Sequence, residues 1–277
     1  MFSERGAWID RHTEHINAMD YLDIDVLQCS REKIRMYLLG LVSDPRPVCF
    51  RNGCELFSES AWFDFLHSFC GFRPDKRHFV GETWKQKDTY KLAEKVWWEV
   101  SYQPKKASAY AFSNTRQPLH NDNAWFSDPS DINFSVMTKQ ASEGGHSLFY
   151  LNEQLVADLI EEAPKLFHEL TTRIVTVKKG SDESVGNRTT ILTRNGSWKT
   201  SWNYYRTTRE NPQVERMCDD FFSFLEKKES SKSVINLKLE DGDCIAWNDS
   251  ALLHGRTAFE ATRPFDRVFR QSMWNYS

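Results

Sequence analysis

The stretch that decides the fold is "QPLHNDNAW", residues 117–125, in which His120 and Asp122 stand two positions apart. In an extended strand, residues i and i+2 point to the same side, so both side chains can reach one metal ion. A third ligand is available in "ALLHGRTAF", residues 251–259, which contains His254. Two imidazoles and one carboxylate on one face of an octahedral ion leave three positions open. An isolated His-x-Asp is nevertheless more often a strand end that ordinary hydrogen bonds satisfy.

The composition limits the possible classes of protein. Of 277 residues, 40% are hydrophobic and 27% are charged, so the chain can bury a sizeable core. The formal net charge of -3 disfavours nucleic acid as a partner, because such binding usually needs a basic surface. Six scattered cysteines without a C-x-x-C pair are typical of a reducing cytoplasm. The sequence also lacks an apolar signal region and any apolar stretch of membrane-spanning length, so we expect a cytoplasmic protein without a membrane partner.

Short strands dominate the pattern along the chain. Runs of β-branched and aromatic residues between Gly, Asn or Asp turns predict strands at 133–138, 147–151, 173–179, 189–194, 234–239, 244–247 and 267–274. Helices are expected after capping or first-turn residues that precede periodic apolar runs, namely Ser30, Ser58, Asn152, Pro164 and Asn211. The pattern predicts a mainly β fold with peripheral helices, either a sandwich or a jelly roll, in one domain over residues 1–277.

Four ordered blocks extend the signal beyond a single tripeptide. They are "LHNDNAW", "EGGHSLFYL", "DGDCIAWNDSALLHGRTAF" and "DRVFRQSMW". Together they resemble the Fe(II)- and 2-oxoglutarate-dependent dioxygenases of the taurine dioxygenase and TfdA type, a group that includes γ-butyrobetaine hydroxylase. The resemblance is clear over residues 110–277. It implies a double-stranded β-helix, or cupin-like jelly-roll, core and a hydroxylation that consumes O2 and 2-oxoglutarate and releases succinate and CO2.

The resemblance also assigns roles to individual residues. It implies that His120, Asp122 and His254 bind Fe(II). It further implies that Ser147, after the paired glycines, and Arg267, in "DRVF", hold the distal carboxylate of 2-oxoglutarate. A guanidinium fork grips a carboxylate through two hydrogen bonds, and a hydroxyl adds one donor. The family more often has threonine at the position of Ser147.

Residues for the substrate are harder to choose than ligands for the metal. The candidates near the two ligand motifs, in the aromatic segment 201–208 and on the last strand are Asn123, Arg116, Trp125, Asn203, Tyr205, Arg270 and Gln271. By resemblance, the residue that follows the aspartate ligand lines the substrate chamber, which nominates Asn123, and Trp125 would point to the same side as Asn123 in an extended strand. Taurine-type enzymes have a substrate-binding arginine where Gln271 stands, which argues against a sulfonate. The segment 80–100 is a candidate lid or an ordinary solvated surface.

The leading interpretation is an iron oxygenase that hydroxylates a small polar molecule, such as an amino acid, a small carboxylate or a natural-product intermediate. An oxidase of the same family would instead desaturate or cyclise its substrate. A catalytically silent jelly-roll module that binds or senses metal is a rival, although it would have no need for Arg267. Metal-dependent hydrolysis, which works without O2, is a third possibility. The sequence leaves the oligomeric state open.

Overall fold

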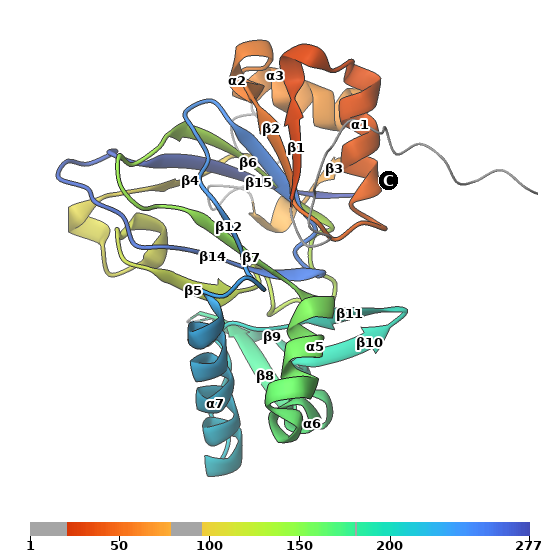
Figure 1. The fold of residues 1–277 in the computed structure, drawn as a ribbon, viewed down its shortest axis with the longest axis vertical. Helices are drawn as coiled ribbons and strands as arrows, with labels where there is room; N and C mark the ends of the chain where they lie inside the picture. Colours follow the sequence, from red (N-terminus) through yellow and green to blue (C-terminus); the bar gives the residue numbers. More distant parts are fainter. Residues whose placement is uncertain (1–20, 79–95, 181) are drawn as a thin grey trace, which may run out of the picture.

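Two β-sheets packed face to face form the centre of the protein, with helices on both outer sides (Figure 1). The computed structural model describes residues 21–78, 96–180 and 182–277. Within these residues the larger sheet has seven strands in the order β1-β2-β13-β6-β15-β3, with β4 also paired to β15. Its strands are β1 (Leu22–Asp25), β2 (Val48–Arg51), β3 (Arg73–Pro74), β4 (Trp98–Ser101), β6 (Ile132–Lys139), β13 (Cys244–Trp247) and β15 (Val268–Asn275).

The smaller sheet holds the strands that carry the two histidines of interest. Its order is β12-β7-β14-β5, and its strands are β5 (Gln117–His120), β7 (Ser147–Leu151), β12 (Ile235–Leu237) and β14 (Leu252–Arg256). Two hairpins complete the described strands. They pair β8 (Ile174–Lys179) with β9 (Asp182–Thr190) and β10 (Leu192–Asn195) with β11 (Ser197–Thr200).

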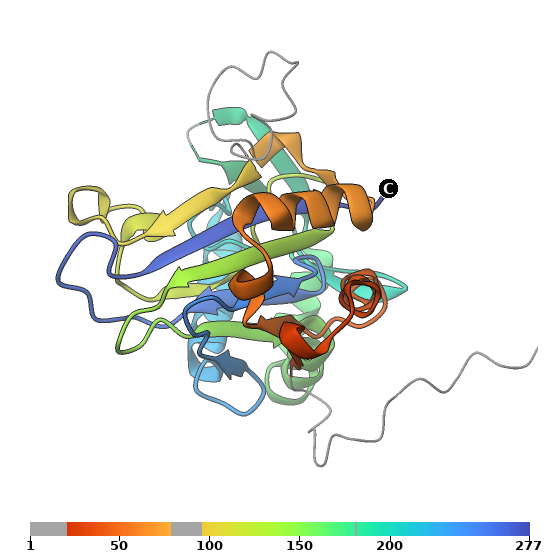
Figure 2. The same cartoon turned by 90° about the horizontal axis from the view of Figure 1, so that it is seen from above.

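Helices cover the outer face of each sheet (Figures 1 and 2). Near the larger sheet lie α1 (Arg31–Gly40), α2 (Gly53–Leu56) and α3 (Glu59–Asp64), and near the smaller sheet lie α5 (Asn152–Glu162), α6 (Pro164–Thr172) and α7 (Pro212–Lys228). The predicted caps of α1, α3 and α7 are confirmed, because Ser30, Ser58 and Asn211 each accept a backbone N–H from the first turn of the helix.

Strand periodicity divides the buried side chains between separate cores. Along β13, Cys244 joins the core under α1 and α3, whereas Ile245 joins the core between the two sheets. Along β7, Leu148 packs towards α5 and α7, whereas Phe149 packs between the sheets. Both faces of these strands are covered, which is why their sequences are almost continuously apolar rather than alternating.

The predicted strands agree with the structure where hydrophobic runs are uninterrupted. Those at 147–151 and 244–247 coincide with β7 and β13. The single strand predicted at 189–194 is wrong, because β9 ends at Thr190 and β10 begins at Leu192. The hydroxyl of Thr190 donates to the carbonyl oxygen of Leu192 at 2.8 Å, a local bond that competes with strand pairing.

The expectation that His120 and Asp122 share one strand is also wrong. His120 is the last residue of β5, and Asp122 lies in the turn that follows. Asn123 has a φ of 62°, in the left-handed region, so the chain loses its two-residue alternation there. The turn, rather than strand periodicity, brings the carboxylate beside the imidazole.

The candidate lid and the expected lack of a membrane-spanning segment both concern whole segments of the chain. Most of the candidate lid at 80–100 lies outside the described residues. Among the described helices, none has both the length and the apolar character needed to span a membrane.

The paired glycines before β7 allow the chain to make a close turn. Gly144 has a φ of 72° and Gly145 a φ of 69°, a backbone conformation that favours glycine. A β-carbon on Gly144 would overlap the carbonyl oxygen of Ala258 and come within 2.9 Å of the α-carbon of Phe259. The turn therefore needs glycine at this position for backbone conformation and for space.

We expect Gly144→Ala to lower the free energy of unfolding by more than about 2 kcal/mol. The energetic cost of a positive φ in alanine adds to the cost of the overlap with the backbone of Ala258. Gly196→Ala is the matched control, since Gly196 has a φ of 74° but open space around its α-carbon. Its cost should be about 1 kcal/mol. Urea unfolding of both variants measures the difference, and equal losses would contradict the importance of the close approach.

Candidate metal centre

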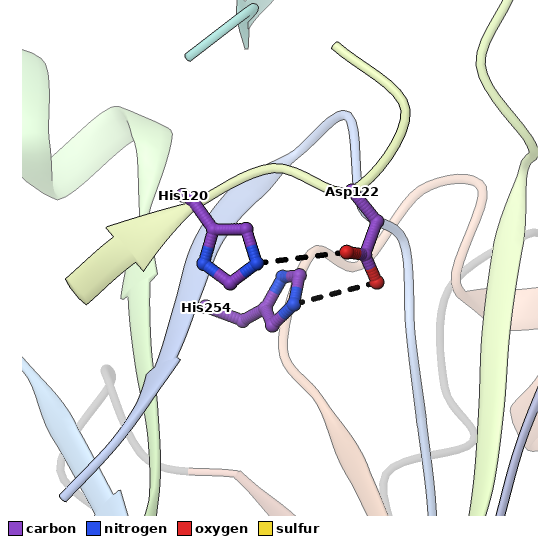
Figure 3. Close-up of side chains that lie close together, drawn as sticks. All are labelled: His120, Asp122 and His254. Carbon is purple, nitrogen blue, oxygen red and sulfur yellow. Dashed lines mark ion pairs between the residues drawn. The ribbon is translucent and has the colours of Figure 1, made fainter. Parts of the chain in front are cut away.

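Three potential ligands converge beside the paired strands β5 and β14 (Figure 3). Backbone pairing of β5 with β14 sets His120 directly opposite His254, with ring centroids 4.3 Å apart. The Nε2 atom of His120 lies 3.5 Å from Oδ1 of Asp122, and Nε2 of His254 lies 3.5 Å from Oδ2. One nitrogen or oxygen from each residue falls within 4.8 Å of the others.

Each imidazole is oriented through its outer nitrogen. Nδ1 of His120 donates to the carbonyl oxygen of Pro118 at 2.8 Å. Nδ1 of His254 lies 2.9 Å from Oδ1 of Asp249, a carboxylate on the loop before β14. Both rings therefore turn Nε2 towards Asp122, which is the arrangement that metal-binding histidines usually need.

The carboxylate of Asp122 has its own support. Nε2 of Gln271 donates to Oδ2 of Asp122 at 2.7 Å, and Nδ2 of Asn133 lies 3.4 Å from the same oxygen. Burial opposes the charge of Asp122, but the nearby His254 and His120 and the Gln271 amide outweigh it. Together they hold the pKa of Asp122 well below its usual range.

The buried charges around His254 act in opposite directions. Burial disfavours the imidazolium, but the carboxylates of Asp122 and Asp249 outweigh it and raise the pKa of His254. Burial raises the pKa of Asp249 itself. Two carboxylates therefore lie beside the imidazole of His254, and their negative charge would attract a cation bound there.

Asn121, between the two ligands, points away from them into the protein. Its amide donates to the carbonyl oxygens of Asp249 and Leu252 at 2.6 and 2.8 Å. Its side-chain oxygen accepts the backbone N–H of Trp202 at 3.1 Å. Asn121 therefore joins the end of β5 to the loop before β14 and keeps His120 and Asp122 in register with His254.

The donor set fits a divalent transition-metal ion such as iron. It has two imidazole nitrogens and one carboxylate oxygen, all presented from one side, and the outer nitrogens of both rings are already occupied. The side chains of His120, Asp122 and His254 are only 8%, 23% and 12% exposed, so the ligands are largely shielded but not sealed from solvent.

A second corner of the site lies where Arg267 contacts the chain two residues before Ser147. Ser147 begins β7 and is buried, and Arg267 precedes β15 with 3% of its surface exposed. The guanidinium donates to the carbonyl oxygen of Gly145 and to the side chain of Gln140, both at 3.3 Å. A β-carbon on Gly145 would come within 3.0 Å of Nε of Arg267, so this glycine leaves room for the arginine.

Sequence reasoning missed a second buried arginine at this corner, Arg256. It lies two residues after His254 on β14, and its register partner on β7 is Ser147. Its exposed fraction is 4%, and Nη2 donates to the carbonyl oxygens of Ser113 and Thr115 at 3.0 and 2.7 Å. The letters "HGR" show an arginine two residues after the histidine ligand. Its position next to Ser147 follows only from the pairing of β14 with β7.

Both arginines proposed for the substrate form ion pairs elsewhere. Arg116 pairs with Glu226 and Glu229 of α7 at 2.6 and 3.1 Å. Arg270 pairs with Glu99 at 2.8 Å. These ion pairs occupy both guanidinium groups, so the structure does not bring either arginine to the ligands as a free cation.

Other substrate candidates have mixed positions. Asn123 donates to the sulfur of Met273 at 2.9 Å, and Trp125 packs against the core beneath α5 and α7. Gln271 contacts the ligand Asp122 rather than an open chamber. By contrast, Asn203 and Tyr205 line a small cavity that His120 also borders, together with Tyr110, Gln117, Pro118, Leu119 and Tyr204.

Gln117 is a cavity residue that sequence reasoning missed. Its Nε2 lies 3.2 Å from Nε2 of His120, the nitrogen that faces Asp122. The cavity wall therefore reaches the ligand cluster through an uncharged amide. A glutamine three residues before a histidine carries no recognisable sequence signal of its own.

Comparison with known protein families explains why these features occur together. The profile of the taurine catabolism dioxygenase TauD, TfdA family matches residues 13–273. The chain belongs to the TauD/TfdA family. The resemblance noted in the four sequence blocks is thereby confirmed. A comparison with curated proteins gave no significant match.

Solved structures share the fold of this TauD/TfdA member at low sequence identity. Asparagine oxygenase (AsnO) aligns with a TM-score of 0.66 and 12% identity over 88% of this chain and 78% of that chain. PvcB from Pseudomonas aeruginosa aligns with a TM-score of 0.62 and 13% identity over 98% and 95%. The non-heme iron oxygenase OrfP, in complex with Fe and alpha-ketoglutaric acid, aligns with a TM-score of 0.57 and 11% identity over 89% and 80%.

We expect Gln271→Leu to weaken Mn(II) binding about 10- to 100-fold, because Asp122 would lose its shortest hydrogen bond. Titration followed by the paramagnetic resonance of free Mn(II) measures the affinity. Gln154→Leu is the matched control, since Gln154 also donates to a carboxylate, that of Asp158, but on α5. Unchanged Mn(II) affinity with an altered substrate requirement would instead assign Gln271 to the substrate.

Proposed function

We propose that this TauD/TfdA member is an Fe(II)- and 2-oxoglutarate-dependent oxygenase that hydroxylates an unactivated C–H bond of a small polar molecule. The observation that carries the proposal is the convergence of His120, Asp122 and His254, with both imidazoles oriented from behind. Two nitrogen donors and one carboxylate on one side are the ligands of non-haem Fe(II) oxygenases.

The proposed architecture is a double-stranded β-helix, or jelly roll, in a single domain. The two packed sheets and the placement of the ligands on β5 and β14 support this interpretation. One domain is supported because the larger sheet combines β1, which begins at Leu22, with β15, which ends at Asn275. A cytoplasmic location stays a prediction from the cysteine pattern.

Each residue of the site has a definite task in this proposal. Bound Fe(II), with 2-oxoglutarate and O2, supplies the oxidising power that the reaction needs. His120 and His254 contribute neutral nitrogen donors, and Asp122 contributes the negative charge that partly neutralises the ion. Ser147 and Arg267 hold the distal carboxylate of 2-oxoglutarate, which fixes the co-substrate relative to the ligands.

Amino acids are the substrate class that we favour. A structure of asparagine oxygenase contains 3-hydroxyasparagine and succinate, and one of OrfP contains hydroxy-L-Arg. The cavity beside His120 supports a neutral side chain, because Tyr110, Gln117, Asn203 and Tyr205 line it with phenols and amides rather than with acids or cations. Burial, followed by its contact with Tyr205, raises the pKa of Tyr110 to about 12. This phenol, like an ordinary tyrosine, is therefore uncharged at neutral pH.

Three alternatives make different predictions about turnover. A desaturase or cyclase would release succinate but leave no hydroxyl group in the product. Metal-dependent hydrolysis would proceed without O2. A silent binding module would hold metal without consuming 2-oxoglutarate, and the buried Arg267 argues against it because a cation there has no use without an anion.

We expect the purified protein to release succinate when Fe(II), O2, 2-oxoglutarate and a suitable neutral amino acid are present. Asp122→Ala and His254→Ala should each lower the rate by more than about 100-fold, because each removes a ligand. Gln154→Leu should leave the rate unchanged. Product formation without O2, or full activity in both ligand variants, would contradict the proposal.

A further inference from the structure

Two buried arginines face the same aromatic ring. The guanidinium carbon of Arg256 lies 4.9 Å from the centre of the Phe259 ring, and that of Arg267 lies 5.5 Å from it. Only 4% of Arg256 and 3% of Arg267 is exposed. A single corner of the protein therefore holds two cations away from water.

Neither arginine has an acidic partner among the described residues. Arg267 donates to Gly145 and Gln140, and Nη2 of Arg256 donates to backbone carbonyl oxygens, while Nε of Arg256 is buried without a hydrogen-bond partner. Burial, with repulsion from Arg256, lowers the pKa of Arg267 to about 9. Burying cations without a counter-charge is unfavourable unless an anion completes the site.

Strand register fixes where such an anion would sit. Arg256 lies directly across from Ser147 in the pairing of β14 with β7, and it is two residues beyond His254 on β14. Residues two apart on a strand share a face, so Arg256 lies on the face that carries the ligand His254. Arg256, Ser147 and Arg267 thus border one corner next to the candidate metal centre.

We propose that Arg256 is a second arginine for the distal carboxylate of 2-oxoglutarate, and that the pair makes the site selective for 2-oxo acids with a second carboxylate. The inference rests on the proposed function and adds Arg256 to the residues that resemblance assigned. Its free Nε–H supplies a further donor, and its charge adds to the attraction of Arg267. Contacts of a carboxylate with charged donors are the stronger kind of hydrogen bond.

Arg256 also has a purely structural role that must be separated from binding. Through Ser113 and Thr115 it anchors the segment before β5, which follows the cavity residue Tyr110. Loss of this anchor would disturb the whole site and would weaken the binding of every 2-oxo acid to a similar extent. Loss of a carboxylate contact would weaken the binding of only those 2-oxo acids that have a distal carboxylate.

Calorimetric titration of the Mn(II)-loaded protein with 2-oxoglutarate and with 2-oxobutyrate separates these roles. 2-Oxobutyrate has the same 2-oxo acid head but hydrogen in place of the distal carboxylate. We expect Arg256→Gln to weaken the binding of 2-oxoglutarate about 10-fold and Arg267→Gln to weaken it about 100-fold. The affinity for 2-oxobutyrate should be almost unchanged in both variants. Arg263→Gln is the matched control, because Arg263 is exposed, and it should change neither affinity.

The outcomes are distinguishable from failure of the proposed function. Wild-type protein that binds Mn(II) but not 2-oxoglutarate would overturn the oxygenase proposal itself. If wild type binds 2-oxoglutarate but Arg256→Gln leaves its affinity unchanged, or lowers both affinities equally, the role of Arg256 is refuted. Should Arg256→Gln fail to fold, Arg256→Lys keeps the charge but loses Nε–H, and a selective loss of a few-fold for 2-oxoglutarate is required.

Discussion

The pairing of β5 with β14 is the constraint on which the rest of the site depends. It sets His120 opposite His254 although the two residues are far apart in the sequence. A shift of one residue would turn one imidazole to the other face of the sheet, because side chains alternate along a strand. Asn121 holds this register from within, since its amide binds the backbone of the loop that leads into β14. The backbone hydrogen bonds of the fold therefore hold the two histidine ligands opposite each other.

Charge is distributed unevenly around this pairing. The carboxylates of Asp122 and Asp249 lie beside His254, in the middle of β14, whereas Arg256, at the end of β14, and Arg267 both face the ring of Phe259. A cation bound beside the carboxylates and an anion bound beside the arginines would each lie next to residues of opposite charge. The two groups of charges are thus held next to each other by one strand of five residues, which carries His254 and Arg256 two positions apart.

The ligands and the 2-oxoglutarate residues could be proposed from the sequence because they lie in ordered motifs with unusual residue types. The local geometry could not, because Asp122 reaches the site through a turn with Asn123 in the left-handed region. The roles of Gln271 and Arg256 also depend on partners from distant strands, Asp122 and Ser147. Ion pairs to Glu226 and Glu229 occupy Arg116, and no local pattern around Arg116 indicates them. Register and long-range pairing are the information that a single sequence does not display.

The central claim is that one ion at His120, Asp122 and His254 keeps adjacent positions open for 2-oxoglutarate. Anaerobic absorption spectroscopy tests it most directly, because a 2-oxo acid that chelates Fe(II) through its keto and carboxylate oxygens produces a charge-transfer band. We predict that the band appears only when both Fe(II) and 2-oxoglutarate are added, saturates at one iron per chain, and is lost in His120→Ala. Tight Fe(II) binding without the band, or a band that persists in His120→Ala, would contradict the account.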